Sequence, residues 1–295
     1  MRSGFIGIIG RPNVGKSTLI NSIVGKKIAI TSNKPQTTRN IIQGIYNEDK
    51  YQMVFVDTPG IHKPMDKLGK NLNEQAYFSI DDTDIILFVV DAYEGLGKGD
   101  MYILDKLKEI SKPVFLIINK IDKIDRESII NRIVEYKDLY NFAEIIPISS
   151  IKKDNIKDLI ETLKKYLPDN IRYYGESDIT NKSMEFLMSE IVREKVFNLT
   201  EEEVPHSVTC VTESVTDNKT SYNIRIAIII DRESLKKIIV GSKGSMIKQI
   251  GMSSRIEIEQ LLGKKVYLEL FVKTVKKWRD KEKYLQVYGF NDFKE

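Results

Sequence analysis

At 295 residues, the chain is long enough to hold two domains of ordinary size, each with its own hydrophobic core. Hydrophobic residues make up 41% of the chain and charged residues 30%, which is typical of a soluble globular protein, and the net charge of +4 is too small to identify a partner. The single cysteine, Cys210, excludes a disulfide framework, a disulfide-linked partner and a thiolate metal site, and no segment approaches the ~18–20 apolar residues of a membrane span, so we expect a cytoplasmic protein.

Five apolar runs, separated by segments with helical spacing, indicate the buried strands of a largely parallel sheet. The expected strands are 5–9, 53–56, 85–90, 114–118 and 145–148, and the expected helices are 17–24, 68–79, 101–110, 128–140 and 156–167. Alternating strands and helices predict a three-layer α/β domain over residues 1–168. Ligands of such domains bind at the C-terminal ends of the strands, and four polar motifs fall there.

The first motif lies between the first strand and the first helix. Its glycines allow the backbone N–H groups to face a phosphate, and the helix N-terminus adds a partial positive charge. Lys16 is expected to reach the β- and γ-phosphates, and the Ser17 hydroxyl to bind Mg²⁺. The residues predicted to bind the nucleotide here are Gly10, Arg11, Pro12, Asn13, Val14, Gly15, Lys16, Ser17 and Thr18.

The second motif, Asp57-Thr58-Pro59-Gly60, follows the second strand. We expect Asp57 to hold Mg²⁺ through a water and the Gly60 N–H to contact the γ-phosphate, so that loss of this phosphate frees the following segment. Residues 35–40 are the expected switch segment, in which either Thr37 or Thr38 closes on the metal; we favour Thr38. The predicted nucleotide site therefore includes Asp57, Thr58, Pro59, Gly60 and Ile61, and the predicted Mg²⁺ ligands are Ser17, Thr38 and Asp57.

The third motif, Asn119-Lys120-Ile121-Asp122, and the fourth, Ile148-Ser149-Ser150, indicate which base is bound. The carboxylate of Asp122 can accept two hydrogen bonds from the guanine N1–H and amine, a donor pair that adenine lacks, so Asp122 argues against ATP-driven phosphoryl transfer. Lys120 is expected to stack over the base, and Asn119 to tie its loop to the phosphate loop. Ser149 and Ser150 supply hydroxyl and N–H groups for the base edge.

A polar stretch at 169–181 is the expected linker, and the pattern changes after it. Residues 182–295 predict an α+β module, with helices at 183–197, 235–240 and 245–262, a hairpin of strands 207–215 and 222–231, and a strand at 265–272. Charge is uneven here: residues 176–231 hold 5 basic and 11 acidic side chains, and residues 232–283 hold 14 basic and 6 acidic ones. The basic segment suggests a site for an anionic polymer.

These motifs resemble the translation-factor-related GTPases that carry a C-terminal KH domain. The resemblance rests on Gly-Arg-Pro-Asn-Val-Gly-Lys-Ser, Pro-Gln-Thr-Thr-Arg, Asp-Thr-Pro-Gly and Pro-Ile-Ser, and in the second module on 184–195, 205–208, 239–244 and 268–273. It implies a P-loop GTPase domain followed by a type II KH domain, with GTP or GDP and Mg²⁺ as ligands. It also implies a switch that binds the 3′ end of small-subunit rRNA and assists assembly of that subunit, with peripheral membrane association.

The segment Gly241-Ser242-Lys243-Gly244 lies between two expected helices, where a KH domain grips the backbone of about four nucleotides. The residues predicted to bind RNA are Lys236, Lys237, Gly241, Ser242, Lys243, Gly244 and Lys248. The lysines and the arginine around Trp278 either extend this row of phosphate-binding lysines, or they lie on a solvated helix whose indole packs inward.

The groups expected to act in hydrolysis are Lys16, Thr38, Gly60 and Asn13. Ile61 occupies the place where many small GTPases have a water-positioning glutamine, so the intrinsic hydrolysis should be slow. Our hypothesis is that Asn13 helps to bind K⁺, which would supply positive charge at the β–γ bridge.

A different class of function stays open from the sequence. A signalling GTPase at the membrane could bring the basic segment against anionic lipid. The glycine-bounded loop favours RNA, because lipid binding does not need such a grip.

Overall fold

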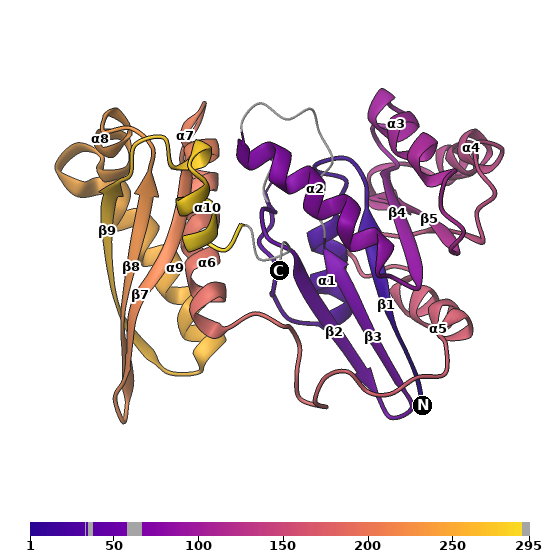
Figure 1. Cartoon of the computed structure of the whole chain (residues 1–295), viewed down its shortest axis with the longest axis horizontal. Helices are drawn as coiled ribbons and strands as arrows, with labels where there is room; N and C mark the ends of the chain where they lie inside the picture. Colours follow the sequence, from indigo (N-terminus) through magenta and orange to yellow (C-terminus); the bar gives the residue numbers. More distant parts are fainter. Residues whose placement is uncertain (33, 35–37, 58–66, 291–295) are drawn as a thin grey trace. The chain divides into compact units, whose positions relative to one another are not determined.

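The computed structural model describes residues 1–32, 34, 38–57 and 67–290, which form two compact units (Figure 1). Apart from residues 67 and 68, the described part of the first unit runs to Asn181 and the second unit begins at Lys182. No helix among the described residues is long and apolar enough to cross a membrane.

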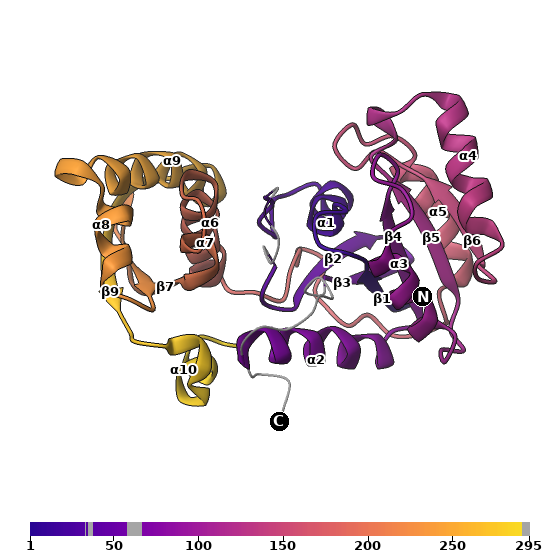
Figure 2. The ribbon, with the colours of Figure 1, turned by 90° about the horizontal axis from the view of Figure 1, so that it is seen from above.

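The first unit is the predicted three-layer α/β domain. Its six-stranded sheet has the order β2-β3-β1-β4-β5-β6, in which all neighbours are parallel except β2 and β3. Figure 2 shows α1 and α2 on opposite faces of this sheet. The strands are β1 (Arg2–Ile9), β2 (Ile42–Glu48), β3 (Tyr51–Asp57), β4 (Ile85–Asp91), β5 (Val114–Asn119) and β6 (Glu144–Pro147). The helices are α1 (Lys16–Val24), α2 (Lys67–Asp81), α3 (Lys98–Leu107), α4 (Arg126–Lys137) and α5 (Ile156–Tyr166), with a 3₁₀ turn, η1 (Ile121–Lys123).

The central strands are buried on both faces, which is why they appear as continuous apolar runs in the sequence. The parallel register places Asp57 beside Ile8, and Asn119 beside Asp91. The ends of β1, β3, β4 and β5 therefore lie along one edge of the sheet, which carries the polar motifs.

The expected linker is hydrogen-bonded to the first unit, first at Gln52 of β3 and then along the outer side of β2. The Gln52 side chain is fully buried, and its Oε1 accepts from the N–H groups of Tyr173 at 2.7 Å and Tyr174 at 3.0 Å. Asn47 donates to three carbonyls, at residues 175, 176 and 178. The Ile45 N–H donates to the Ile179 carbonyl at 2.9 Å, so the segment covers the edge of the sheet.

The second unit is the predicted α+β module. It is a three-stranded sheet in the order β7-β8-β9, with β7 and β8 antiparallel and β8 and β9 parallel. Helix α6 packs on β7 and on α9, which packs on β9 (Figure 2). The elements are α6 (Met184–Leu199), α7 (Val204–Ser207), β7 (Val208–Asp217), β8 (Ser221–Ile230), α8 (Ser234–Val240), η2 (Ser242–Gly244), α9 (Ser245–Leu262), β9 (Lys265–Thr274), η3 (Trp278–Asp280) and α10 (Glu282–Val287).

The core of this unit lies between the helices and one face of the sheet, where branched aliphatic side chains and Cys210 are buried. Trp278 is also fully buried: its Nε1–H donates to the Ser207 carbonyl at 3.0 Å, and its ring stacks on Phe290. Of the two alternatives left open for Trp278, the structure therefore supports inward packing of the indole.

Candidate nucleotide site and candidate RNA-binding loop

The phosphate loop connects β1 to α1 in a conformation that requires glycine at two positions. Gly10 has φ 154° and Gly15 has φ 99°. A Cβ at Gly10 would lie 2.3 Å from the Val89 carbonyl oxygen, and one at Gly15 would lie 2.3 Å from Asn119 Nδ2. The loop is therefore packed tightly against the ends of β4 and β5.

Lys16 begins α1 and is nearly buried. Its Nζ donates to the carbonyl oxygens of Gly10 at 3.0 Å and Arg11 at 2.9 Å, so the ammonium is held by the loop itself. Burial lowers the pKa of Lys16 to about 8, although the charge of Asp57 opposes this shift. A buried ammonium among carbonyls at a helix N-terminus fits a phosphate, whose negative charge would favour the protonated form.

Ser17, Thr38 and Asp57 bring three oxygen atoms together beside Lys16. Ser17 Oγ lies 2.8 Å from both Thr38 Oγ1 and Asp57 Oδ2, and Thr38 Oγ1 lies 3.5 Å from Asp57 Oδ2. The other carboxylate oxygen, Asp57 Oδ1, is buried and has no hydrogen-bond partner among the described residues.

Burial raises the pKa of Asp57 to about 6, and the Lys16 charge and the two hydroxyl groups oppose that shift only in part. Two hydroxyls and a carboxylate with an unsatisfied oxygen are hard donors of the kind that Mg²⁺ takes, so these residues fit the metal. Thr58, Pro59, Gly60 and Ile61 lie outside the described residues, as does Thr37.

The third and fourth motifs are connected to the phosphate loop by side-chain hydrogen bonds. Asn119 Nδ2 donates to the Val14 carbonyl at 2.8 Å, and its Oδ1 accepts from the N–H and hydroxyl of Ser150 at 3.1 and 2.9 Å. Asp122 Oδ1 accepts from the hydroxyl of Ser149, which is fully buried. Among the described residues, these hydrogen bonds connect the third and fourth motifs to the phosphate loop, to which Asp57 of the second motif is also bonded through Ser17. The bond from Ser149 orients Asp122.

Lys120 connects the third motif to Asp91, a residue that belongs to none of the four motifs. Its Nζ donates to the Asn13 carbonyl at 2.6 Å and to Asp91 Oδ2 at 2.6 Å. Asp91 directly follows the apolar run 85–90, just as Asp57 and Asn119 follow theirs, and this position was the signal available in the sequence.

The remaining loop residues differ in where their side chains lie. Arg11 was predicted to bind the nucleotide, but its guanidinium is directed to Asp100 of α3, with Nε 2.9 Å from Oδ1. Val14 is fully buried, Pro12 is partly exposed, and Thr18 lies in the first turn of α1.

The glycine-bounded loop of the second unit forms a sharp connection between α8 and α9. Gly241, Lys243 and Gly244 all have positive φ, at 73°, 49° and 78°. A Cβ at Gly244 would meet nothing within 4 Å, so this position is open to a close approach by another chain. Lysines flank the loop with exposed side chains; they are Lys236, Lys237, Lys243 and Lys248, and Ser242 is exposed as well.

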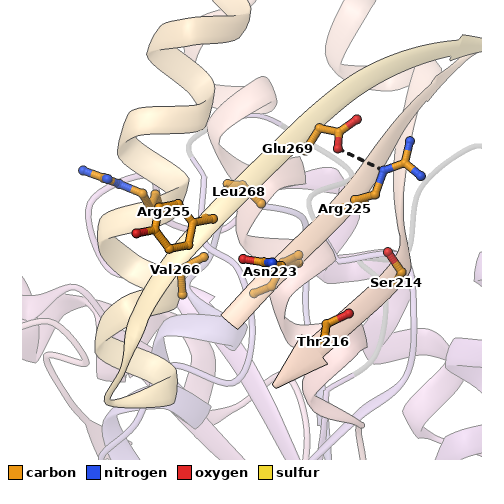
Figure 3. A pocket seen from close by; sticks show the side chains of 10 residues that line it. Ser214, Thr216, Asn223, Arg225, Arg255, Val266, Leu268 and Glu269 are labelled. Carbon is orange, nitrogen blue, oxygen red and sulfur yellow. Dashed lines mark hydrogen bonds and ion pairs between the residues drawn. The ribbon is translucent and has the colours of Figure 1, made fainter. Parts of the chain in front are cut away.

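A separate pocket of about 600 Å³ lies on the sheet of the second unit (Figure 3). Arg225 of β8 and Glu269 of β9 form an ion pair in it, with Arg225 Nε 3.1 Å from Oε2. None of the residues predicted to contact RNA lines this pocket.

Two family models match the chain, one in each unit. Residues 5–120 match the family described as 50S ribosome-binding GTPase, and residues 203–279 match the KH domain. The chain is 49% identical to the GTPase Era of Clostridium kluyveri over 291 residues, which cover 98% of this chain and 99% of that relative.

Solved structures of Era have the same fold over the whole length. A variant of Aquifex aeolicus Era bound to GDP·AlF4⁻ matches with a TM-score of 0.94 and 41% identity, covering 98% of this chain and 99% of that one. Era in complex with MgGDPNP and nucleotides 1506–1542 of 16S ribosomal RNA gives the same values.

Proposed function

The chain belongs to the Era family of GTPases, and from this premise we propose that it is a GTP-driven switch that binds the 3′ end of small-subunit rRNA and assists the assembly of that subunit. The observation that carries the proposal is that one chain holds both a hydrogen-bonded set of nucleotide-motif residues in the first unit and an exposed glycine–lysine loop in the second. A cytoplasmic location is part of this proposal, because assembling ribosomal subunits are found there.

In the nucleotide site, each connected group has a distinct task. Lys16 binds the β- and γ-phosphates, the N–H groups of the loop surround them, and Asp122 selects guanine. Ser17, Thr38 and Asp57 hold Mg²⁺, which when bound neutralises charge between the phosphates. The hydrogen bonds of Ser17 Oγ to Thr38 and Asp57 support Thr38 as the switch threonine.

Ile61 cannot position the attacking water, so hydrolysis depends on other groups. One of them is a source of positive charge at the β–γ bridge. Asn13 lies in the phosphate loop with φ 65°, and its carbonyl accepts from Lys120. We propose that Asn13 helps to bind K⁺ next to the β–γ bridge. Turnover measured in K⁺ should exceed turnover measured in Na⁺ at equal ionic strength, and equal turnover in both would dismiss this role.

In the second unit, the loop between α8 and α9 grips the RNA backbone while the flanking lysines contact phosphates. Gly241→Asp combined with Gly244→Asp should reduce binding of an rRNA 3′-end oligonucleotide at least about tenfold, because two carboxylates would face the phosphates. GTP affinity should not change. Unchanged RNA affinity in the double variant would refute the assignment of this loop.

Two further variants separate this effect from a loss of folding. A Cβ at Gly241 would lie 2.7 Å from Met246 Cβ, so Gly244→Asp alone, which meets open space, is the milder test. Gly263→Asp is the matched control, because Gly263 also has a positive φ of 67° and open space but lies at the other end of α9. It should bind RNA like the wild type.

Contact with an anionic membrane surface is a second candidate function, favoured by the excess of 14 basic over 6 acidic residues in 232–283. Sedimentation with anionic liposomes, compared with neutral ones, tests it directly. Binding to anionic liposomes that competes with the RNA oligonucleotide would assign both ligands to the same basic segment.

A further inference from the structure

We infer that Asp100 is a positioning residue for GTP hydrolysis, which acts through Arg11 to hold the phosphate loop and Lys16 in place. This inference rests on the proposed role of the loop in binding phosphates. It concerns the first turn of α3 and the loop that leads into it from β4, a part of the chain that carries none of the four sequence motifs.

Asp100 is fully buried, and its two carboxylate oxygens have different partners. Oδ2 accepts from the Gly97 N–H at 2.9 Å, which caps α3, and lies 3.4 Å from the Tyr136 hydroxyl. Oδ1 accepts from Arg11 Nε at 2.9 Å. The helix cap uses only one oxygen, so the other is available to bind the phosphate loop.

Arg11 is fixed along its whole length. Its NH2 group donates to the Gly95 carbonyl at 3.0 Å, and NH1 lies 3.5 Å from Glu94 Oε2. A Cβ at Gly97 would lie 2.7 Å from Arg11 NH1, and a Cβ at Gly99 would lie 2.8 Å from Arg11 Cδ. The side chain therefore lies directly on the backbone of the turn, which leaves room for it by having glycine at both positions.

The backbone of Arg11 transmits this anchoring to Lys16. The Arg11 carbonyl accepts from Lys16 Nζ at 2.9 Å. Arg11, whose side chain is held by Asp100, therefore also supplies one of the two carbonyl groups that hold the Lys16 ammonium. A second ion pair joins Asp91, the last residue of β4, to Lys120, whose Nζ also donates to the Asn13 carbonyl. The loop is thus held at residues 11 and 13 by contacts within the protein itself, which is the preorganisation that electrostatic catalysis requires.

Asp100→Asn tests this inference with little change in shape, because the amide oxygen can still cap α3 while the amide nitrogen cannot accept from Arg11. We expect kcat/KM for GTP to fall about tenfold, the size of effect that accompanies loss of one charge-assisted hydrogen bond. Arg11→Ala should have a similar effect, and the double variant should be no worse than either single variant, because the two residues act as one unit. Additive losses would overturn the inference.

The ratio of kcat/KM for GTP to that for ITP distinguishes positioning from general loosening of the site. Inosine lacks the exocyclic amine that Asp122 reads, and Asp122 is oriented by Ser149, far along the chain from Asp100. The ratio should stay unchanged in Asp100→Asn, whereas a loss of preference would mean that the variant disturbs the whole site and would contradict a positioning role.

Two controls complete the experiment. Asp105→Asn removes an exposed carboxylate from the same helix, where it pairs with Lys108, and should behave like the wild type. Lys16→Ala tests the proposed function itself. An active Lys16→Ala protein would refute the phosphate-binding role of the loop, whereas an inactive one together with a fully active Asp100→Asn would refute only the inference about Asp100.

Discussion

Acidification should weaken the binding of Mg²⁺ and GTP, because the pKa of Asp57 is raised by burial to about 6. Only the ionised carboxylate attracts the metal. With a pKa of about 6, the ionised fraction falls from about nine-tenths at pH 7 to about one-tenth at pH 5. The structure therefore predicts that Mg²⁺-dependent nucleotide affinity falls about tenfold between pH 7 and pH 5.

The same pKa has the opposite effect on the stability of the nucleotide-free protein. A carboxyl whose folded pKa lies above its unfolded value of 3.8 destabilises the fold when ionised, and this cost disappears as the pH falls from above 6 to below 3.8. The difference of about two pKa units corresponds to about 3 kcal/mol of unfolding free energy. Relative to Asp57→Asn, the wild type should become more stable in acid while its nucleotide affinity declines.

The assay is equilibrium binding of a fluorescent, non-hydrolysable GTP analogue from pH 5 to pH 8, at fixed Mg²⁺ and ionic strength. Asp57→Asn is measured in parallel, because the phosphates of the nucleotide also titrate in this range and contribute equally to both proteins. If the wild type and Asp57→Asn showed the same pH dependence, the assignment of a raised pKa and a metal-binding role to Asp57 would be wrong.

Two other changes test the packing around the site and around the linker. Gly15→Ala should reduce nucleotide affinity at least about a hundredfold, because the new methyl group would lie 2.3 Å from Asn119 Nδ2 and the backbone φ of 99° disfavours any residue but glycine. Wild-type affinity of this variant in the same fluorescence assay would contradict the loop geometry. Gln52→Ala should lower the unfolding free energy in urea by about 3 kcal/mol, because it removes the buried acceptor for the N–H groups of Tyr173 and Tyr174. It should also expose 169–181 to proteases, and an unchanged digestion pattern would mean that Gln52 does not hold the segment.

The sequence predicted the elements whose residues are buried on both sides. The strand ends at Asp57 and Asn119 could be located because an apolar run stops there and a functional polar residue follows. Strand β2 was missed, because an antiparallel edge strand with Gln43, Tyr46 and Asn47 has no apolar run.

Long-range side-chain contacts could not be predicted from local patterns. The attachment of 169–181 depends on Gln52 and Asn47, more than 120 residues earlier in the chain, and both appear in the sequence as ordinary polar residues. Arg11 was assigned to the nucleotide because it lies inside a phosphate-binding motif, and only the fold brings Asp100 to its guanidinium.

We propose that one chain couples a guanine-nucleotide switch to an RNA-binding loop. The most direct test is to crosslink the full-length protein to total RNA with a non-hydrolysable GTP analogue, with GDP and without nucleotide. This experiment shows both which RNA is bound and whether the nucleotide controls that binding. We predict crosslinks concentrated at the 3′ end of small-subunit rRNA and strongest with the GTP analogue. Crosslinks spread over unrelated RNAs, or of equal yield in all three states, would contradict the claim.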